Sequence, residues 1–212
     1  MATAIPGSDA GGMRDDLPTG RPAVFLDRDG TLNVERNYLS DPARLTLLPG
    51  VPQGLVRLRD AGFLLFVVTN QSGIGRGYYS EADMHAVNRR LEAWVRPDGI
   101  RFEHIYYAPE APEAPSRGRK PSPQFLFDAR DTYGVDLSRS FLIGDKLADL
   151  ECGWNAGVRA SVLVRTGYGR ETEAAHPEAV ARAWVVDDLP GAADRICAVT
   201  GGPRLAGRSG EA

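Results

Sequence analysis

The sequence alternates short apolar runs with segments of helical spacing, and this alternation restricts the fold more than any other feature. The run Phe63–Val68, FLLFVV, is apolar at every position, which is typical of a strand buried on both faces. Ser80 is followed by Glu81 and Asp83, which predicts the start of a helix that runs to about Arg96. Strands that alternate with helices predict a parallel sheet with helices on both faces.

The same pattern continues along most of the chain. Strands are expected at 23–26, 63–68, 104–107, 141–143, 161–164 and 184–186. Helices are expected at 52–61, 80–96, 122–133, 147–156 and 190–199. We therefore expect an α/β domain over residues 22–199. Residues 1–21 are small, polar and Gly/Pro-containing and predict a disordered N-terminal tail, and residues 200–212 predict a flexible C-terminal tail.

The composition gives no reason to expect nucleic acid or a membrane as a partner. Lys and Arg number 25 against 28 Asp and Glu, and the net charge is −3. No apolar stretch approaches the ~20 residues of a membrane span, and the first residues lack the basic start and apolar run of a signal peptide. Cys152 and Cys197 are too few for a disulfide framework or a Cys-rich zinc site. A cytoplasmic location is expected.

Polar residues follow four of the expected strands at the point where each strand ends. The first strand leads into Asp27-Arg28-Asp29-Gly30-Thr31 and the second into Thr69-Asn70-Gln71. The third leads through a Pro-rich segment, 108–116, to Arg119-Lys120, and the fourth into Gly144-Asp145-Lys146, with Asp149 four residues after Asp145. Ligands bind outside the carboxyl ends of strands in such sheets, so a site is predicted at this edge.

These residue types fit phosphoryl transfer through a covalent intermediate. Asp27, the first residue past the strand, is placed to attack phosphorus and form an aspartyl-phosphate. Asp29 is placed to protonate the leaving alcohol and later to activate water, and Gly30 allows the sharp turn that this requires.

Crowded carboxylates would repel a phosphate dianion, which indicates a hard divalent cation such as Mg²⁺. Asp27, the backbone carbonyl of Asp29, and Asp145 are candidate oxygen ligands. Lys120 would offset the remaining negative charge, and Thr69 and Asn70 would hydrogen-bond the phosphoryl oxygens.

Several of these motifs also suggest other interpretations. A calcium loop needs an acid at position 5 and glycine at position 6, where this chain has Thr31 and Leu32. The segment GIGRGY has Tyr78 where a dinucleotide fingerprint needs glycine, so it is interpreted as a flexible loop near the site. Arg119-Lys120 alone also fits a solvated pair before a helix. Cys152 fits a small core residue better than a nucleophile.

The motifs DRDGTLN, VVTNQSGIGRGY, RKPSP and IGDKLADLECGWNAG resemble those of the haloacid dehalogenase (HAD) superfamily of phosphatases. They are most similar to the D-glycero-D-manno-heptose 1,7-bisphosphate 7-phosphatase branch, whose nearest cousins are histidinol-phosphate phosphatases. The likeness covers about residues 22–190, with the motifs in the same order.

The resemblance implies a Rossmann-like three-layer αβα sandwich with no large cap domain, in a cytosolic monomer. It implies Asp27 as nucleophile, Asp29 as general acid/base, and Mg²⁺ on Asp27, Asp29 and Asp145. Thr69 and Lys120 would stabilise the transferring phosphoryl group. It implies substrate contacts from Arg119, Lys146 and the stretch Glu35, Arg36, Asn37 and Tyr38. Further candidate substrate-binding residues are Arg28, Asn70, Gln71 and Ser72.

The segment before Arg119 departs from this branch, which usually carries a zinc loop built from a Cys-x-His and a Cys-x-Cys pair. Residues 108–121, APEAPEAPSRGRKP, contain neither Cys nor His, so no zinc is expected. Pro at every third residue of 109–115 predicts a stiff, extended loop instead. The exact sugar and its anomer stay open at this point.

These motifs predict a Mg²⁺-dependent phosphoric monoester hydrolase of a small sugar phosphate, foremost the 7-phosphate of D-glycero-D-manno-heptose 1,7-bisphosphate. Histidinol phosphate or another polyol or cyclitol phosphate is the alternative substrate. A non-enzymatic phosphoacceptor or binding module is the alternative from another class. Asp29 argues against it, because a module that keeps its phosphoryl group has no use for an acid two residues past the nucleophile.

Overall fold

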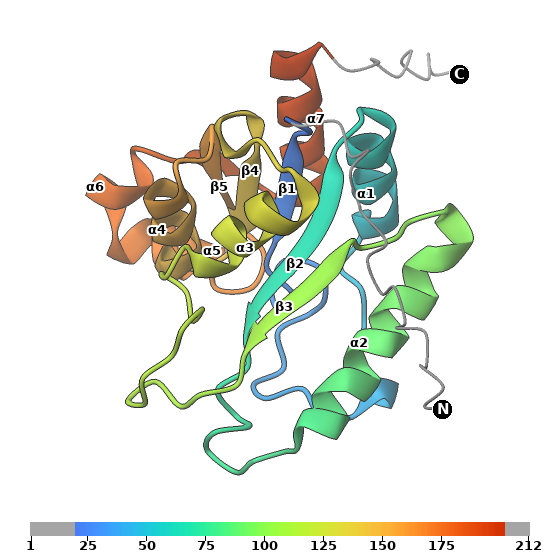
Figure 1. Cartoon of the computed structure of the whole chain (residues 1–212), viewed down its shortest axis with the longest axis vertical. Coiled ribbons are helices and arrows are strands. Elements are labelled where there is room, and N and C mark those ends of the chain that lie inside the picture. The colour runs from blue at the N-terminus through green and yellow to red at the C-terminus, as the bar shows by residue number, and fades with distance from the viewer. Residues whose placement is uncertain (1–19, 202–212) are drawn as a thin grey trace, which may run out of the picture.

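The computed structural model describes residues 20–201, in which a central twisted sheet lies between two layers of helices (Figure 1). Most of both predicted tails lies outside these residues. At the described ends, the Gly20 amide donates to the Gly134 carbonyl at 3.1 Å, and Thr200 is the last residue of the final helix. The described residues therefore extend slightly beyond 22 and 199, and the predicted domain and tail bounds stay predictions.

The sheet has six strands, and every neighbouring pair is parallel. The strands are β1 (Ala23–Leu26), β2 (Leu64–Asn70), β3 (His104–Ala108), β4 (Phe141–Gly144), β5 (Ala160–Val164) and β6 (Trp184–Val186). Their spatial order is β3-β2-β1-β4-β5-β6. The chain thus builds outward from β1 in one direction and then returns to add β4 to its other side. This reversal places the topological switch point of the sheet between β1 and β4, where ligands of such folds bind.

The helices lie between successive strands of the chain, except α7, which follows β6. They are α1 (Val51–Asp60), α2 (Glu81–Val95), α3 (Gln124–Tyr133), α4 (Leu147–Ala156), α5 (Gly169–Ala175), α6 (Pro177–Val180) and α7 (Leu189–Thr200). Short 3₁₀ turns occur at Pro42–Arg44, Arg96–Asp98 and Leu137–Arg139. The predicted start of α2 is confirmed, because the Ser80 hydroxyl accepts from the Asp83 amide at 3.2 Å and Asp83 accepts from the Ser80 amide at 2.8 Å.

Helices α5 and α6 were not predicted from the sequence. Helix α5 begins at Gly169 without a capping side chain, and it is held instead by a tertiary bond from the Thr172 hydroxyl to the Asp145 carbonyl at 2.9 Å. Such a helix leaves no pattern in its own residues because its stability comes from the groups around it.

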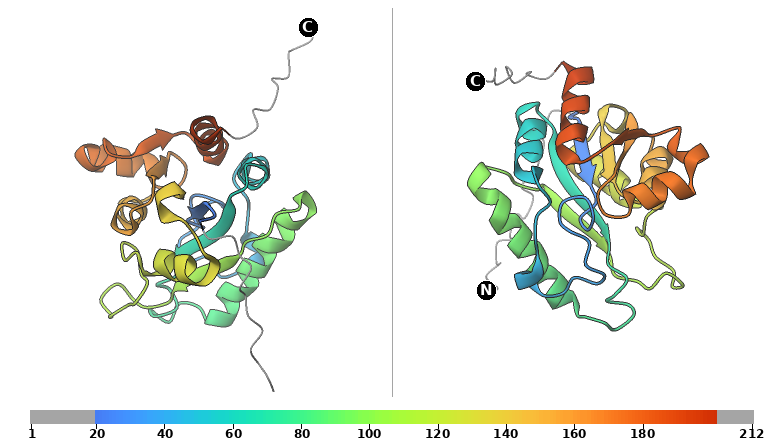
Figure 2. Two further views of the ribbon diagram at one scale, coloured as in Figure 1. Left: turned by 45° about the horizontal axis from the view of Figure 1, so that its top comes forward. Right: turned by 180° about the vertical axis from the view of Figure 1, so that it is seen from behind.

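Side chains of β1 alternate between two apolar clusters, one on each face of the sheet. Helices cover both of these faces (Figure 2). Val24 and Leu26 pack with the cluster that includes residues of α1, α2 and α7. Ala23 and Phe25 pack with the cluster that includes residues of α3 and α4. Residues 64–69 of β2 are all buried, as the apolar run predicts. The predicted fold class, a three-layer αβα sandwich, is confirmed.

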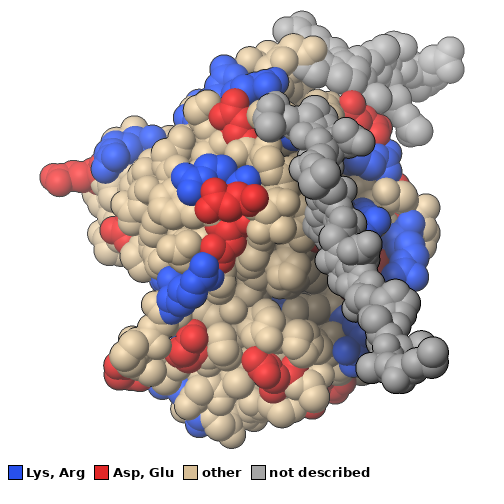
Figure 3. All heavy atoms as spheres, viewed as in Figure 1, with Lys and Arg blue, Asp and Glu red and all other residues tan. Residues whose placement is uncertain are grey.

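Within residues 20–201, none of the helices combines the length and the apolar character that a membrane span requires. Basic and acidic side chains are interspersed over most of the face drawn in Figure 3. That face therefore shows neither a broad basic nor a broad acidic patch.

Candidate active site

The turn after β1 brings two carboxylates to the switch point. The Asp27 amide donates to the Ile143 carbonyl of β4 at 2.9 Å, which fixes the start of the turn beside β4. Gly30 has φ +82°, and a Cβ there would lie 2.2 Å from Asp145 Oδ2. Glycine is required at position 30 because the backbone is left-handed and passes against the Asp145 carboxylate.

Three buried carboxylates gather at this edge. One oxygen from each of Asp27, Asp145 and Asp149 lies within 4.8 Å of the others. Burial, opposed by Lys120, raises the pKa of Asp27 to about 6. Burial and the neighbouring charges of Asp27 and Asp149 raise the pKa of Asp145 to about 8.

This carboxylate cluster fits a hard divalent cation. Asp145 Oδ2 accepts from the Tyr168 amide at 2.8 Å, whereas Oδ1 has no hydrogen-bond partner among the described residues. A buried carboxylate oxygen without a donor is costly unless a ligand satisfies it. Oxygen donors of this kind are those that Mg²⁺ prefers.

Lys120 is the buried cation that faces these acids. Its Nζ lies 2.6 Å from Asp27 Oδ1, 2.5 Å from Asp149 Oδ1 and 2.7 Å from the Val68 carbonyl. Burial opposes the charge on Lys120, but Asp149 and Asp27 outweigh burial and raise its pKa. Lys120 is therefore not part of a solvated pair; it carries a positive charge into the centre of the site.

Asn70 fixes the backbone of Lys120. Its side-chain oxygen accepts from the Lys120 amide at 3.0 Å, and its side-chain nitrogen donates to the Lys120 carbonyl at 3.2 Å. Both polar atoms of the Asn70 side chain are therefore engaged in positioning Lys120. The contact between this side chain and a phosphoryl oxygen stays a prediction.

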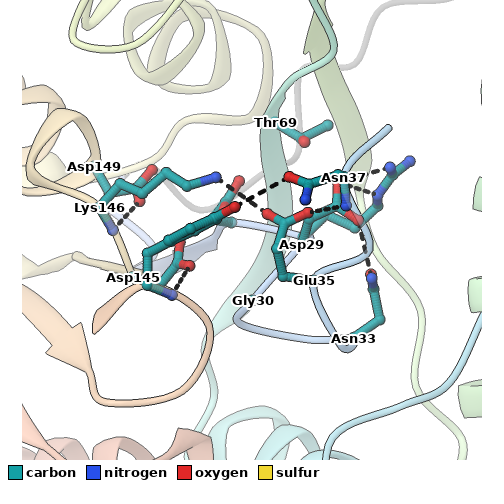
Figure 4. A network of polar contacts seen from close by, with 12 residues as sticks. Asp29, Gly30, Asn33, Glu35, Asn37, Thr69, Asp145, Lys146 and Asp149 are labelled. Atoms are coloured by element: carbon teal, nitrogen blue, oxygen red, sulfur yellow. Dashed lines mark hydrogen bonds and ion pairs between the residues drawn. The ribbon is translucent and has the colours of Figure 1, made fainter. Parts of the chain in front are cut away.

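Asp29 occupies a separate environment from the other acids (Figure 4). Its carboxylate accepts from Arg28 at 2.7 Å, from Gln71 at 3.0 Å and from Asn33 at 2.9 Å. Burial opposes ionisation of Asp29, but the Arg28 charge and these hydrogen bonds outweigh burial and lower its pKa. The Asp29 carboxylate is thus set apart as an ionised proton acceptor, and the metal ligation predicted for Asp29 through its backbone carbonyl stays a prediction.

A pocket of about 200 Å³ opens above these groups. Most of the predicted site residues line it, namely Asp27, Asp29, Glu35, Asn37, Tyr38, Thr69, Asn70, Gln71, Ser72, Lys120 and Lys146.

Three predicted substrate-binding side chains do not line this pocket. Arg28 is fully buried and donates to Asp29, Gln71 and Asn88, so the prediction that its side chain binds substrate is wrong. Arg36 is exposed outside the pocket, and Arg119 turns back to the Glu110 carbonyl at 3.4 Å.

The sequence placed Asp149 at this edge without giving it a role, and it gave no sign of Tyr79 and Tyr168; all three line the pocket. The spacing of Asp149, one helical turn after Asp145, was the available signal. Tyr79 donates to Gln71 at 2.7 Å. Tyr168 follows a strand that the sequence predicts, but it comes directly before helix α5, which the sequence does not predict.

The Pro-rich segment is only partly extended, because a turn closes between Ala111 and Ala114, whose backbone groups bond at 3.0 Å. The Ser116 hydroxyl donates to Glu110 at 2.7 Å, and the Pro109 carbonyl accepts from the Gly75 amide at 2.8 Å. The bond from Gly75 therefore joins this segment to the loop 73–78, and the other two hold the segment's own shape. Cys152 lies in the core, and burial raises the pKa of its thiol to about 12, so its interpretation as a core residue is confirmed.

Comparison with known proteins identifies similar chains. The HAD-hydrolase-like family model matches residues 118–192. The D-glycero-beta-D-manno-heptose-1,7-bisphosphate 7-phosphatase of Photorhabdus laumondii is 38% identical over 165 residues, which cover 74% of this chain and 88% of the relative. The protein of the same name from Escherichia coli K12 is 37% identical over 175 residues, covering 79% of this chain and 90% of the relative.

Solved structures of heptose bisphosphate phosphatases are also similar to this chain. The D,D-heptose 1,7-bisphosphate phosphatase from B. bronchiseptica, complexed with magnesium and phosphate, matches with a TM-score of 0.77 at 32% identity. The match covers 84% of this chain and 99% of that one. The corresponding phosphatase from Burkholderia thailandensis matches with a TM-score of 0.63 at 30% identity, covering 82% and 97%.

Proposed function

The chain belongs to the heptose-1,7-bisphosphate 7-phosphatase family of HAD-like phosphoric monoester hydrolases, and on this premise we propose that it removes the 7-phosphate of D-glycero-D-manno-heptose 1,7-bisphosphate. The observation that carries the proposal is the joint placement of Asp27, Asp145 and Lys120 at one strand edge, with Asp29 held apart from them. A site for phosphoryl transfer needs such a set of nucleophile, charge compensation and separate proton carrier.

Mg²⁺ is the cofactor that this donor set fits. Asp27 and Asp145 would hold it together with the backbone carbonyl of Asp29, while Asp149 engages Lys120. When bound, the ion neutralises charge between the carboxylates and the phosphate.

The protein's own groups then divide the reaction into two halves. Asp27 attacks phosphorus and displaces the sugar alkoxide, which takes a proton from Asp29. A phosphate dianion beside Asp29 opposes its ionisation, so the substrate complex favours the protonated acid that this step requires. In the second half, Asp29 takes a proton from the water that attacks the aspartyl-phosphate, and the hydrogen bonds from Arg28, Gln71 and Asn33 stabilise its ionised form.

Lys120 and Thr69 stabilise the charge on the phosphoryl group during both transfers. Lys120 is buried and already charged, so no reorganisation is needed when negative charge shifts to the phosphoryl oxygens. Thr69 is the residue before the last of β2 and lines the pocket, with its hydroxyl accepting from Gln71 at 2.8 Å.

The proposal is tested by phosphate release with Mg²⁺ over a panel of substrates. The panel contains both anomers of heptose 1,7-bisphosphate, histidinol phosphate and smaller sugar phosphates, with Asp27→Asn as the inactive control. We expect the highest kcat/KM on a heptose bisphosphate. Flat, slow turnover of every compound, or preference for histidinol phosphate, would contradict the proposal. The cytoplasmic location and the monomeric state stay predictions, and the latter is tested by sedimentation of the full chain.

A further inference from the structure

We infer that Tyr168 is a positioning residue that sets the sugar specificity of this site, by holding Lys146 and the loop 35–38 in place for the part of the substrate away from the reacting phosphate. The inference rests on the proposed function and names the residue through which that pocket selects its substrate.

Tyr168 is anchored by its backbone to the acid cluster. Its amide donates to Asp145 Oδ2 at 2.8 Å. Tyr168 lies in the short connection after β5, directly before helix α5. The next residue, Gly169, leaves no room for a side chain, since a Cβ there would lie 1.7 Å from the Val164 carbonyl. The close approach of the backbone therefore fixes where the Tyr168 ring enters the pocket.

The Tyr168 side chain makes two contacts across the pocket. Lys146 Nζ lies 4.7 Å from the centre of its ring, within the range of a cation–π interaction. Its hydroxyl donates to Asn37 Oδ1 at 3.0 Å. The first contact reaches the β4–α4 side of the site, and the second reaches the loop that follows β1.

Two further contacts close these into a ring of four residues. Lys146 Nζ lies 3.2 Å from Glu35 Oε2, an interaction drawn in Figure 4. Glu35 Oε1 in turn accepts from the Asn37 amide at 2.9 Å. All four side chains line the pocket, so a change at Tyr168 reaches Lys146, Glu35 and Asn37 together.

The loop 35–38, which these four residues hold in place, has a strained backbone. Asn37 has φ +43° and Tyr38 has φ +63°, which side-chain-bearing residues adopt at a cost. Such conformations persist only where surrounding contacts fix them. Tyr168 supplies one such contact from the opposite wall of the pocket, and Tyr78 supplies another by packing edge-on against Tyr38 with ring centres 4.8 Å apart.

This set of four residues lies on the outer side of the site. The side chains of Lys146 and Glu35 are 46% and 18% exposed, whereas those of Lys120 and Asp27 are 4% and 7% exposed. The buried pair of Lys120 and Asp27 faces the reacting phosphate. The outer set of four residues therefore faces the rest of the substrate. An ammonium, a carboxylate and an amide fit the hydroxyls of a sugar, and the ammonium fits a second phosphate.

The test compares two Tyr168 variants on two substrates. The substrates are the sugar phosphate that the wild-type enzyme prefers and p-nitrophenyl phosphate, whose far end has a nitro group but neither hydroxyls nor a second phosphate. Tyr168→Phe removes only the hydroxyl, and Tyr168→Leu also removes the ring. Tyr133→Phe is the matched control, because the Tyr133 hydroxyl donates to the Glu103 carbonyl at 3.3 Å away from the pocket. Circular dichroism and thermal melting verify the fold of each variant.

We expect the ratio of kcat/KM for the sugar phosphate to that for p-nitrophenyl phosphate to fall about 3–10-fold in Tyr168→Phe, as the loss of one hydrogen bond gives. The fall should be larger in Tyr168→Leu and should come mainly from KM of the sugar phosphate. Tyr133→Phe should keep the wild-type ratio.

An unchanged ratio in both Tyr168 variants, or an equal loss on both substrates, would overturn the inference while leaving the proposed function intact. A wild-type enzyme that prefers no sugar phosphate over p-nitrophenyl phosphate would refute the proposed function and, with it, the selectivity assigned to Tyr168.

Discussion

Replacing Lys120 with methionine removes the only lysine ammonium that contacts the acid cluster directly among the described residues. The ammonium lies 2.6 Å from Asp27 Oδ1 and 2.5 Å from Asp149 Oδ1, and both carboxylates are almost fully buried. Methionine has nearly the same length and fills the same space without a charge. The substitution therefore isolates the electrostatic part of the interaction.

The expected cost follows from the burial of these groups. Removing one partner of a buried ion pair costs about 3–5 kcal/mol, because the remaining charge stays in a site of low polarity. Domains of this kind have an unfolding free energy of about 5–15 kcal/mol, so the variant should be clearly weakened yet still fold. Lys146→Met is the matched control. Its side chain is 46% exposed and its ion pair with Glu35 is 3.2 Å long, so it should cost about 1 kcal/mol or less.

The loss should depend on pH in one direction. The pKa of Asp27 is about 6 even with Lys120 present, above the ~3.9 of an unfolded chain, and removing Lys120 raises it further. Ionisation of Asp27 therefore disfavours the folded state. The penalty is absent below the unfolded pKa and complete above the folded pKa, so it should be larger at pH 8 than at pH 5.5.

The assay is urea unfolding followed by tryptophan fluorescence, with EDTA present, at both pH values. We expect Lys120→Met to lose several times more unfolding free energy than Lys146→Met at pH 8, and the difference to shrink at pH 5.5. Equal losses in the two variants, or a deficit that grows as the pH falls, would refute the electrostatic account of Lys120.

Three further predictions concern the acids and the turn between them. Asp29→Asn should reduce turnover by ~10²–10⁴, the loss typical of removing a general acid/base, and steady-state kinetics showing near-wild-type kcat would exclude that role. The rise in Tm that Mg²⁺ produces should increase from pH 5.5 to pH 8, because protons compete with the ion for Asp27 and Asp145, whose pKa values are raised to about 6 and about 8; scanning fluorimetry showing a pH-independent rise would contradict this. Gly30→Ala should abolish that Mg²⁺-dependent rise, whereas Gly62→Ala, with φ +87° but no atom within 4 Å of its new Cβ, should retain it; retention by both variants would show that the close approach to Asp145 is unimportant.

The central strands β1, β2, β4 and β5 could be predicted closely because they are buried on both faces and form largely apolar runs. The one notable difference is at the end of β2, predicted to stop at Val68 and observed to continue to Asn70. Thr69 and Asn70 stay in the sheet because they pair with Tyr107 and Ala108 of β3. This pairing joins residues far apart in the sequence. Because Thr69 and Asn70 are polar, the apolar pattern of the sequence does not predict that they belong to the strand.

Convergence of Asp27, Lys120 and Asp145 could be predicted because the carboxyl ends of parallel strands share one edge. Side-chain direction could not be predicted in the same way. Arg28 follows Asp27 directly, yet it points away from the pocket and donates to Asn88 of α2 at 2.9 Å. Only the folded position of α2 reveals that Arg28 serves Asp29 and does not reach the substrate.

The central claim is that Asp27 becomes phosphorylated during turnover, and it is tested by trapping that intermediate. In Asp29→Asn, p-nitrophenyl phosphate should still phosphorylate the enzyme, because its leaving group needs no acid, while the loss of the base slows hydrolysis. Acid quenching, borohydride reduction and peptide mass spectrometry should then convert position 27, and no other aspartate, to homoserine. Modification of a different aspartate, or normal turnover by Asp27→Asn, would contradict the mechanism.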